Sequence, residues 1–336
     1  MGLQRIRISL GTAISLGLIE GRAAVPPTTA YLLTYHEGRC SSNCAFCPQA
    51  RGASSDADKL SRVSWPAFPT EDALAKLAAA GRGGPFKRVC LQVINYEGAF
   101  EDSLNLIARL RSSGLPISIS CQPLSPSRLR ELRGADVERV GIPLDAASEE
   151  VFERVKGELA GGPYKWAEHL RSLRSAVSIF GKGMVTTHLI VGLGERDADL
   201  CKLIQELSDL GISTALFALS PIKGTALEGS APPSLARYRK IQLARYLIEK
   251  GLSRFERMGF DEGGRIIDFG MRPHELLKAM GSGEPFETSG CPGCNRPFYT
   301  ERAGGPIYNF PRPLREEELR EAMAMAIGRD GIAWGW

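Results

Sequence analysis

Three cysteines lie within eight consecutive residues near the start of the chain. In the stretch GRCSSNCAFCP, residues 38–48, the spacing of Cys40, Cys44 and Cys47 is C-x3-C-x2-C. Thiolates are the ligands that soft metals and iron–sulfur clusters prefer. A four-iron cluster has four corners, so three cysteines would leave one iron open to a substrate or cofactor. The motif therefore predicts a metal centre with one open position.

A second pair of cysteines lies near the C-terminus. Cys291 and Cys294 form the sequence GCPGC, and this C-x2-C spacing is also typical of metal sites. Eight cysteines are too few for a disulfide scaffold in a chain of 336 residues. Cys201 falls within a helical pattern, and we expect it in the core.

The chain between these motifs alternates strand and helix patterns. The nearly continuous apolar runs predict buried strands, and the amphipathic segments between them predict helices that cover the sheet. This rhythm gives six strand–helix units and favours an α/β fold, an open partial (β/α)6 barrel with right-handed crossovers. The strands are expected at 30–38, 88–96, 117–124, 139–145, 185–194 and 214–222. Because functional residues of parallel barrels lie at the C-terminal ends of strands, the first cysteine loop is well placed for function.

Both ends of the chain depart from this rhythm. Residues 1–29 carry Arg5 and Arg7 before an apolar stretch, but glycines dilute that stretch and Glu20 and Arg22 occupy the place of a signal-peptide cleavage site. We interpret them as an N-terminal arm or helix. Residues 30–253 form the barrel, and residues 254–336 form a C-terminal extension with a Gly-Gly hairpin, two helices and the GCPGC element.

Composition excludes several functions. The formal net charge is +4, with 43% hydrophobic and 24% charged residues. This modest charge does not indicate nucleic-acid binding, and no apolar run is long enough to span a membrane. We expect a cytoplasmic protein.

The first cysteine motif resembles the signature of the radical S-adenosylmethionine (SAM) enzymes. The resemblance includes aromatic Phe46 before the last cysteine and extends over roughly residues 30–225, with a matching six-unit barrel. It implies a SAM-cleaving [4Fe–4S] cluster on Cys40, Cys44 and Cys47. It also implies that the amino and carboxylate groups of SAM bind the open iron, and that one electron then cleaves SAM to a 5′-deoxyadenosyl radical.

The same resemblance implies a set of SAM contacts. The sequence LIVGLGE (189–195) is similar to the fifth-strand motif along adenine and ribose, and LSPIKGT (219–225) is similar to the sixth-strand motif along adenine. The usual Gly-Gly-Glu of the second strand is replaced by INYEG, and Asp145 matches a ribose-binding Asp of the biotin-synthase group. The implied contacts are Phe46, Asn95, Glu97, Asp145, Val191, Gly192, Gly194, Pro221 and Gly224. For the three glycines, an ordinary turn role is the alternative.

The resemblance to the biotin-synthase group also implies a second cluster. Cys90 and Cys121 match strand cysteines that hold a sulfur-donating cluster in that group, but Thr186 stands where a third is expected. This departure speaks against a true biotin synthase. Cys291 and Cys294 would complete a set of four thiolates if the extension folds back over the barrel. The alternative for Cys90 and Cys121 is that they are merely buried small residues.

The extension resembles that of biotin synthase-related proteins, some of which look like one component of a two-component lipoyl synthase. The phrases YHEGRC…NCAFCPQA and GC..CNRPFY.ER.GG..YN.PR carry this resemblance. It implies sulfur insertion at an unactivated carbon of an octanoyl chain on a lipoyl domain or glycine-cleavage carrier protein. A second radical SAM component and an electron donor such as ferredoxin are implied partners. Insertion into another small substrate, dethiobiotin included, and an auxiliary cluster that only transfers electrons stay open.

Three further residues have weaker claims to function. His188 shares a strand face with Thr186, so it either contacts SAM or substrate or is a core histidine. Arg296 and Arg302 flank the tail cysteines and either orient a carboxylate or the cluster, or lie on the surface. A non-catalytic alternative is a structural zinc protein that uses Cys44, Cys47, Cys291 and Cys294.

Overall fold

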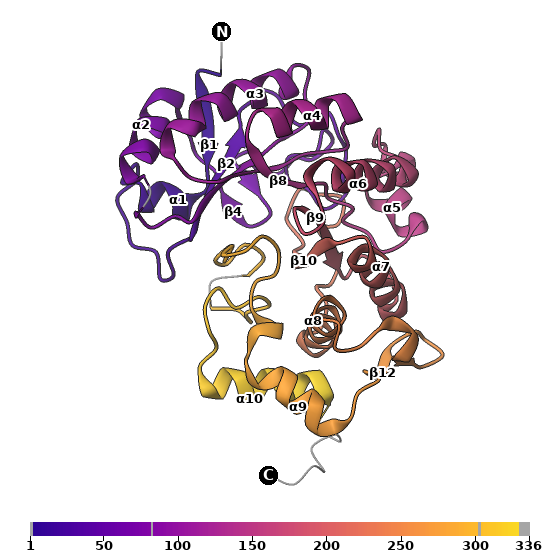
Figure 1. Cartoon of the computed structure of the whole chain (residues 1–336). Coiled ribbons are helices and arrows are strands. Elements are labelled where there is room, and N and C mark those ends of the chain that lie inside the picture. The colour runs from indigo at the N-terminus through magenta and orange to yellow at the C-terminus, as the bar shows by residue number, and fades with distance from the viewer. Residues whose placement is uncertain (1–2, 82, 302–303, 329–336) are drawn as a thin grey trace.

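The computed structural model describes residues 3–81, 83–301 and 304–328 (Figure 1). The predicted Arg302 lies outside the described residues. Among the described residues, no helix combines the length and the apolar character that crossing a bilayer would require.

Six parallel strands form most of one sheet. They are β2 (Thr29–Thr34), β6 (Arg88–Gln92), β7 (Ile117–Ser120), β8 (Val137–Gly141), β9 (Val185–Val191) and β10 (Ile212–Ala218). Their order is β10-β9-β8-β7-β6-β2, so neighbours in the parallel part follow chain order, and β1 (Arg5–Ile8) and β5 (Ala67–Pro69) continue the sheet beyond β2. This is the progression of a (β/α) barrel that has not closed, and it confirms the predicted α/β fold.

Helices join these strands and cover the outside of the sheet. They are α2 (Thr70–Ala80), α3 (Ala99–Leu110), α4 (Pro126–Gly134), α5 (Glu149–Val155), α6 (Trp166–Phe180), α7 (Asp197–Asp209) and α8 (Leu235–Glu249). Short 3-10 turns occur at Arg111–Ser113, Glu158–Ala160, Phe255–Arg257 and Glu284–Phe286. The apolar runs of the strands are buried because helices cover one face and the interior of the barrel lies on the other.

The N-terminal residues differ from the predicted arm. Strand β1 (Arg5–Ile8) pairs antiparallel with β2 on one side and with β5 (Ala67–Pro69) on the other, and helix α1 (Leu10–Ser15) follows it. Ile6 and Ile8 are fully buried. The arm therefore covers the edge of the first barrel strand, which would otherwise present unpaired backbone groups. The long loop after β2 also contains a small hairpin, β3 (Lys59–Leu60) and β4 (Val63–Ser64).

The C-terminal extension folds back onto the barrel. It contains the predicted hairpin, β11 (Gly259–Phe260) and β12 (Ile266–Asp268), and helices α9 (Pro273–Gly281) and α10 (Glu316–Ile327). Helix α10 packs against α8. In Figure 1 the extension, orange to yellow, lies on the opposite side of the sheet from α3 and α4. Cys291, Cys294 and Arg296 of the extension's loop 288–313 thereby line a cavity together with residues of the barrel strands.

One buried arginine ties this loop to the barrel. Arg239 of α8 is only 2% exposed, and its guanidinium donates to the backbone carbonyls of Ile307 and Tyr308. It also lies over the ring of Phe310, 5.0 Å from the ring centroid. Burial lowers the pKa of Arg239 to about 10, so the side chain stays charged at neutral pH.

Replacing Arg239 with Met should loosen the extension. The variant loses charge-assisted hydrogen bonds and leaves buried carbonyls unpaired, which we expect to lower the free energy of unfolding by about 3 kcal/mol. Faster proteolysis within residues 288–313 should accompany this loss, measured by timed digestion and mass analysis. Arg130→Met, on the exposed face of α4, is the matched control. Unchanged cleavage in the Arg239 variant would contradict the anchoring role.

Candidate active site

Seven of the eight cysteines line one cavity at the C-terminal ends of the barrel strands. They are Cys40, Cys44, Cys47, Cys90, Cys121, Cys291 and Cys294. The eighth, Cys201, is fully buried within α7, as predicted from its helical pattern. The fold therefore brings cysteines from both ends of the chain into one space.

The backbone fixes the first cysteine loop. The N–H of Cys40 donates to Gln49 O (3.1 Å), and the N–H of Cys47 donates to Cys44 O (3.0 Å). The backbone N–H of Asn95, after β6, donates to the sulfur of Cys40 at 3.2 Å. Amide donors directed at cysteine sulfurs are among the contacts that tune iron–sulfur clusters. The loop thus presents three thiols to the cavity in a defined arrangement.

Burial disfavours the charged form of two of these thiols, Cys44 and Cys47. It raises the pKa of Cys47 to about 12, and the charge of Cys40 adds to the effect. Burial also raises the pKa of Cys44 well above its ordinary value, partly offset by the nearby charge of Lys156. Thiolates become stable here only if a positive centre is bound among them. The donor set therefore fits a bound iron–sulfur cluster.

The arrangement differs from that of a site for one metal ion. Within the described parts of the chain, no group of three or more His, Cys, Asp or Glu side chains is placed to hold a single ion. A four-iron cluster instead spreads its thiolates over separate irons. A zinc ion on Cys44, Cys47, Cys291 and Cys294 would combine residues of two different groups, because Cys47 lies near Cys40 whereas Cys291 and Cys294 lie near Cys90.

The tail cysteines lie close to Cys90. Burial is the largest cause of the raised pKa of Cys90, and the charges of Cys291 and Cys294 are the next largest causes. The hydroxyl of Tyr31, the register partner of Cys90, lies 3.1 Å from the sulfur of Cys294. The backbone N–H of Arg296 donates to that hydroxyl at 2.9 Å. The extension thus delivers two thiols to the first and second barrel strands.

Cys121 does not join this group. The β6–β7 register places Ser118, not Cys121, beside Cys90, and Cys121 follows the end of β7. Burial alone raises the pKa of Cys121 to about 12, with no contribution from another cysteine. Cys121 lines the cavity, but the structure groups only Cys90, Cys291 and Cys294.

The predicted SAM contacts divide into two sets. Phe46, Asn95 and Asp145 line the cavity. Glu97 is exposed and does not line it. Val191 is the last residue of β9, and Gly192, Gly194, Pro221 and Gly224 belong to the loops after β9 and β10; none of the five lines the cavity.

Two of these glycines have a clear conformational role. Gly192 has φ +111°, and Gly224 has φ +83°, a region that other residues rarely adopt. A Cβ at Gly224 would lie 2.4 Å from the backbone nitrogen of Ser55, next to the cysteine loop. The N–H of Ser54 donates to Gly224 O at 2.9 Å. Gly224 therefore allows the sixth-strand loop to contact the cysteine loop directly.

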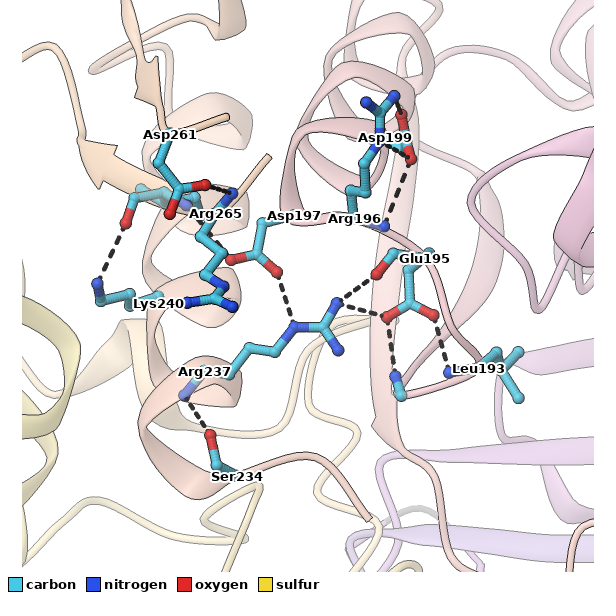
Figure 2. Close-up of polar contacts among 12 residues, drawn as sticks. Leu193, Glu195, Arg196, Asp197, Asp199, Ser234, Arg237, Lys240, Asp261 and Arg265 are labelled. Carbon is cyan, nitrogen blue, oxygen red and sulfur yellow. Dashed lines mark hydrogen bonds and ion pairs between the residues drawn. The ribbon is translucent and has the colours of Figure 1, made fainter. Parts of the chain in front are cut away.

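An ion-pair network that no sequence motif indicated holds the fifth-strand loop. The carboxylate of Glu195 accepts hydrogen bonds from the N–H groups of Gly192 and Leu193, each at 2.8 Å, and Figure 2 shows the contact with Leu193. Arg237 of α8 pairs with Glu195 at 2.9 Å and with Asp197 at 2.7 Å. The sequence signal for this network was the pair Glu195 and Asp197 at the start of a helix, because buried acids need a cation as partner. The network fixes the shape of the LIVGLGE turn.

His188 and Arg296 face the cavity. Burial lowers the pKa of His188 to about 3, so its imidazole is neutral at physiological pH. Its ring packs edge-on against Phe217, with centroids 5.1 Å apart, and the Arg296 guanidinium lies 4.3 Å from the centre of the same ring. Arg296 is thus a cavity residue rather than a surface charge. It is held over an aromatic face in a favourable cation–π geometry.

Comparison with known proteins agrees with this site. The family model described as "Radical SAM superfamily" matches residues 34–207, just over half of the chain. The chain therefore belongs to the radical SAM superfamily. Membership implies a [4Fe–4S] cluster and SAM, consistent with the three thiols of the first cysteine loop.

The curated relatives are biotin synthases. The chain is 27% identical over 229 residues to biotin synthase of Synechococcus elongatus, which covers 66% of this chain and 67% of that protein. It is 28% identical over 251 residues to biotin synthase of Desulforudis audaxviator, covering 73% and 70%. Among solved structures, methylornithine synthase (PylB) has a TM-score of 0.51 at 15% identity, over 71% of this chain and 66% of that one. The structural likeness supports the fold, and the sequence likeness supports a biotin synthase-related group.

Replacing Cys40, Cys44 or Cys47 with Ala should remove the SAM-cleaving cluster. Each variant should lose about four irons per chain and the electron paramagnetic resonance signal that changes when SAM is added. Iron analysis and spectroscopy after anaerobic reconstitution measure this. Cys201→Ala is the matched control, because that thiol is buried in α7 and should leave the iron content unchanged. Equal iron loss in the control would argue for general unfolding instead.

Proposed function

We propose that this protein inserts sulfur at an unactivated C–H carbon of a protein-bound octanoyl chain, in the biosynthesis of the lipoyl cofactor. The observation that carries the proposal is the presence of two separate cysteine groups in one cavity. Cys40, Cys44 and Cys47 come from one loop, and the second group combines Cys90 with Cys291 and Cys294. A radical SAM enzyme needs only the first group to cleave SAM, so the second group calls for another role.

The second group suits an auxiliary iron–sulfur cluster. Its three thiols come from β6 and the extension, and Tyr31 and Arg296 lie next to them. Arg296 has a raised pKa because the thiols and Tyr31 around it favour its positive charge, although burial opposes this effect. A fixed cation of this kind stabilises an anionic cluster. Such a cluster, beside the place where a carbon is activated, is a chemically reasonable source of sulfur.

Part of the cavity wall is apolar. The side chains of Leu33, Ile94, Ile119, Ile190 and Phe217 line the cavity. Tyr299 of the extension is half-buried and lies near both groups: desolvation is the largest cause of its raised pKa, and the charges of Cys47 and Cys90 each raise it further. These residues can hold an alkyl chain and exclude water from it. When bound, the cluster and SAM supply a radical that can break an unactivated C–H bond.

A second candidate is sulfur insertion into a small free substrate such as dethiobiotin. The biotin synthases among the relatives favour it. Thr186 speaks against it, because it lines the cavity where the biotin-synthase group is expected to have a third strand cysteine. Ser118, which pairs with Cys90 across β6 and β7, is a second strand position next to the proposed cluster that carries no thiol. An auxiliary cluster that only transfers electrons is the remaining alternative.

Anaerobic incubation with SAM, a reductant and an octanoyl-lysyl peptide tests the substrate. We expect the peptide to gain the mass of one or two sulfur atoms, and dethiobiotin to remain unchanged under the same conditions. The Cys40→Ala variant, which lacks the cluster loop's first ligand, is the inactive control. One added sulfur would support a second radical SAM component for the other insertion. Conversion of dethiobiotin alone would overturn the proposal in favour of the second candidate.

Replacing both Cys291 and Cys294 with Ser should remove the auxiliary cluster and leave the SAM-cleaving cluster in place. We expect the iron content to fall from about eight to about four per chain, because one of two four-iron clusters is lost. Cleavage of SAM to 5′-deoxyadenosine should persist, while sulfur insertion stops. Iron analysis and chromatography of the nucleoside measure the two effects. A variant that keeps all of its iron would refute the auxiliary site.

The substrate also defines the proposed partners. An octanoylated lipoyl domain or glycine-cleavage carrier protein would present the chain, and a low-potential donor such as ferredoxin would supply electrons. Gly290, Cys291, Cys294, Arg296, Tyr299 and Thr300 of the extension line the cavity that would receive this octanoyl chain.

A further inference from the structure

One segment of the barrel supports the cysteine loop from behind. It is residues 149–165, which include α5 and the turn after it. The backbone N–H of Ala45 donates to Val155 O (2.8 Å), and the Asn43 amide donates to Ala160 O (2.6 Å). The hydroxyl of Ser42 and the hydroxyl of Tyr164 also form a hydrogen bond with each other. The residues between the three cluster cysteines, Ser42 and Asn43 on one side of Cys44 and Ala45 on the other, therefore contact this segment.

Lys156 lies at the centre of the segment and is fully buried. Its ammonium group donates to the carbonyl of Pro143 and pairs with the carboxylate of Asp145 at 2.7 Å. It also lies 5.4 Å from the centre of the Tyr164 ring. A buried charge is tolerated only when it is paired and hydrogen-bonded, and Lys156 meets both conditions. Neither the sequence motifs nor the proposed chemistry accounts for a lysine at this position.

Asp145 is held in an uncommon backbone conformation. It has φ +67°, and β9 holds it on both sides, because its N–H donates to His188 O and its carbonyl accepts from Ile190 N–H, each at 2.8 Å. Its side chain lines the cavity. Lys156 is the hydrogen-bonding partner of Oδ2, and Oδ1 has no hydrogen-bonding partner among the described residues. Asp tolerates this conformation better than most residues, but the conformation still costs free energy that the surrounding contacts must offset.

We propose that Lys156 is a positioning residue for SAM. By binding one carboxylate oxygen of Asp145, it turns the other oxygen to the cavity, where it can accept hydrogen bonds from the vicinal hydroxyls of a ribose. Because its own segment carries the cysteine loop, Lys156 also fixes the position of this carboxylate relative to the cluster cysteines. The inference rests on membership in the radical SAM superfamily and is independent of the substrate proposed above.

The alternative is that Lys156 only neutralises a buried acid. The two roles differ in their dependence on the ribose hydroxyls. A positioning residue affects a ligand that carries these hydroxyls, whereas a residue that only stabilises the fold affects every ligand of the cavity equally. An analogue of SAM without the 2′- and 3′-hydroxyls therefore separates them.

The test measures the dissociation constants of SAM and of its 2′,3′-dideoxy analogue by calorimetry, with the anaerobically reconstituted protein. For Lys156→Met we expect SAM to bind at least about tenfold more weakly, as expected for loss of a charge-assisted hydrogen bond, and the analogue to bind unchanged. Iron content and the cluster spectrum without SAM should match the wild type. Unchanged SAM binding, or equal weakening for both ligands, would overturn the proposal.

A second comparison covers the case in which Lys156→Met does not fold because Asp145 is left unpaired. The double variant Lys156→Met/Asp145→Asn removes both charges and should fold. Because Lys156 acts through Asp145, this double variant and Asp145→Asn alone should bind SAM with the same affinity. A weaker affinity of the double variant would contradict the proposal. Failure of octanoyl conversion would leave these results unaffected, so the two proposals fail separately.

Discussion

Thiols gathered in a buried cavity cannot ionise unless positive charge is bound among them. Burial raises the pKa of the cavity cysteines Cys47 and Cys121 to about 12, and that of Cys44 and Cys90 further. A bound iron–sulfur cluster offsets this cost for these four thiols, because its positive irons favour thiolates. The barrel, the loops and the extension are arranged to meet this requirement while leaving room for a cofactor and a substrate.

The cavity is assembled from distant parts of the chain. The open sheet supplies one wall, and the extension, anchored by Arg239 to α8, supplies the other. The hydrogen bond between Tyr31 and Cys294 joins residues 263 positions apart in the sequence. This closure by a tail explains how a six-stranded barrel without a closed sheet can still exclude water from radical chemistry.

Buried ion pairs hold the cavity's loops. Arg237 pairs with Glu195 and Asp197 to shape the turn after β9, and Lys156 pairs with Asp145 after β8. Such pairs contribute little net stability, because desolvation offsets much of their attraction, but they define geometry strongly. Their position around the cofactor region is consistent with a need for precise placement rather than for added stability.

The class of fold and the first cysteine loop can be predicted from the sequence without a structure. Both depend on local signals: the alternation of apolar strands with amphipathic helices, and three cysteines on one short loop. The sequence also located the hairpin and the helices of the extension, because turn residues and helical periodicity are local as well. The short strand β1 escaped detection, since four residues carry too little periodicity to be recognised.

Which distant residues lie together became clear only in the folded chain. Strand pairing places Ser118 beside Cys90, whereas Cys121 follows the end of β7, and the sequence pattern of an apolar run gives neither the register nor the last residue of the strand. The fold also left Glu97 exposed and brought Arg296 into the cavity. The partners of Glu195 and Asp145 come from other elements, so no spacing in the sequence could predict these ion pairs. Local patterns fix what each segment becomes, whereas pairing across the barrel depends on how all segments pack at once.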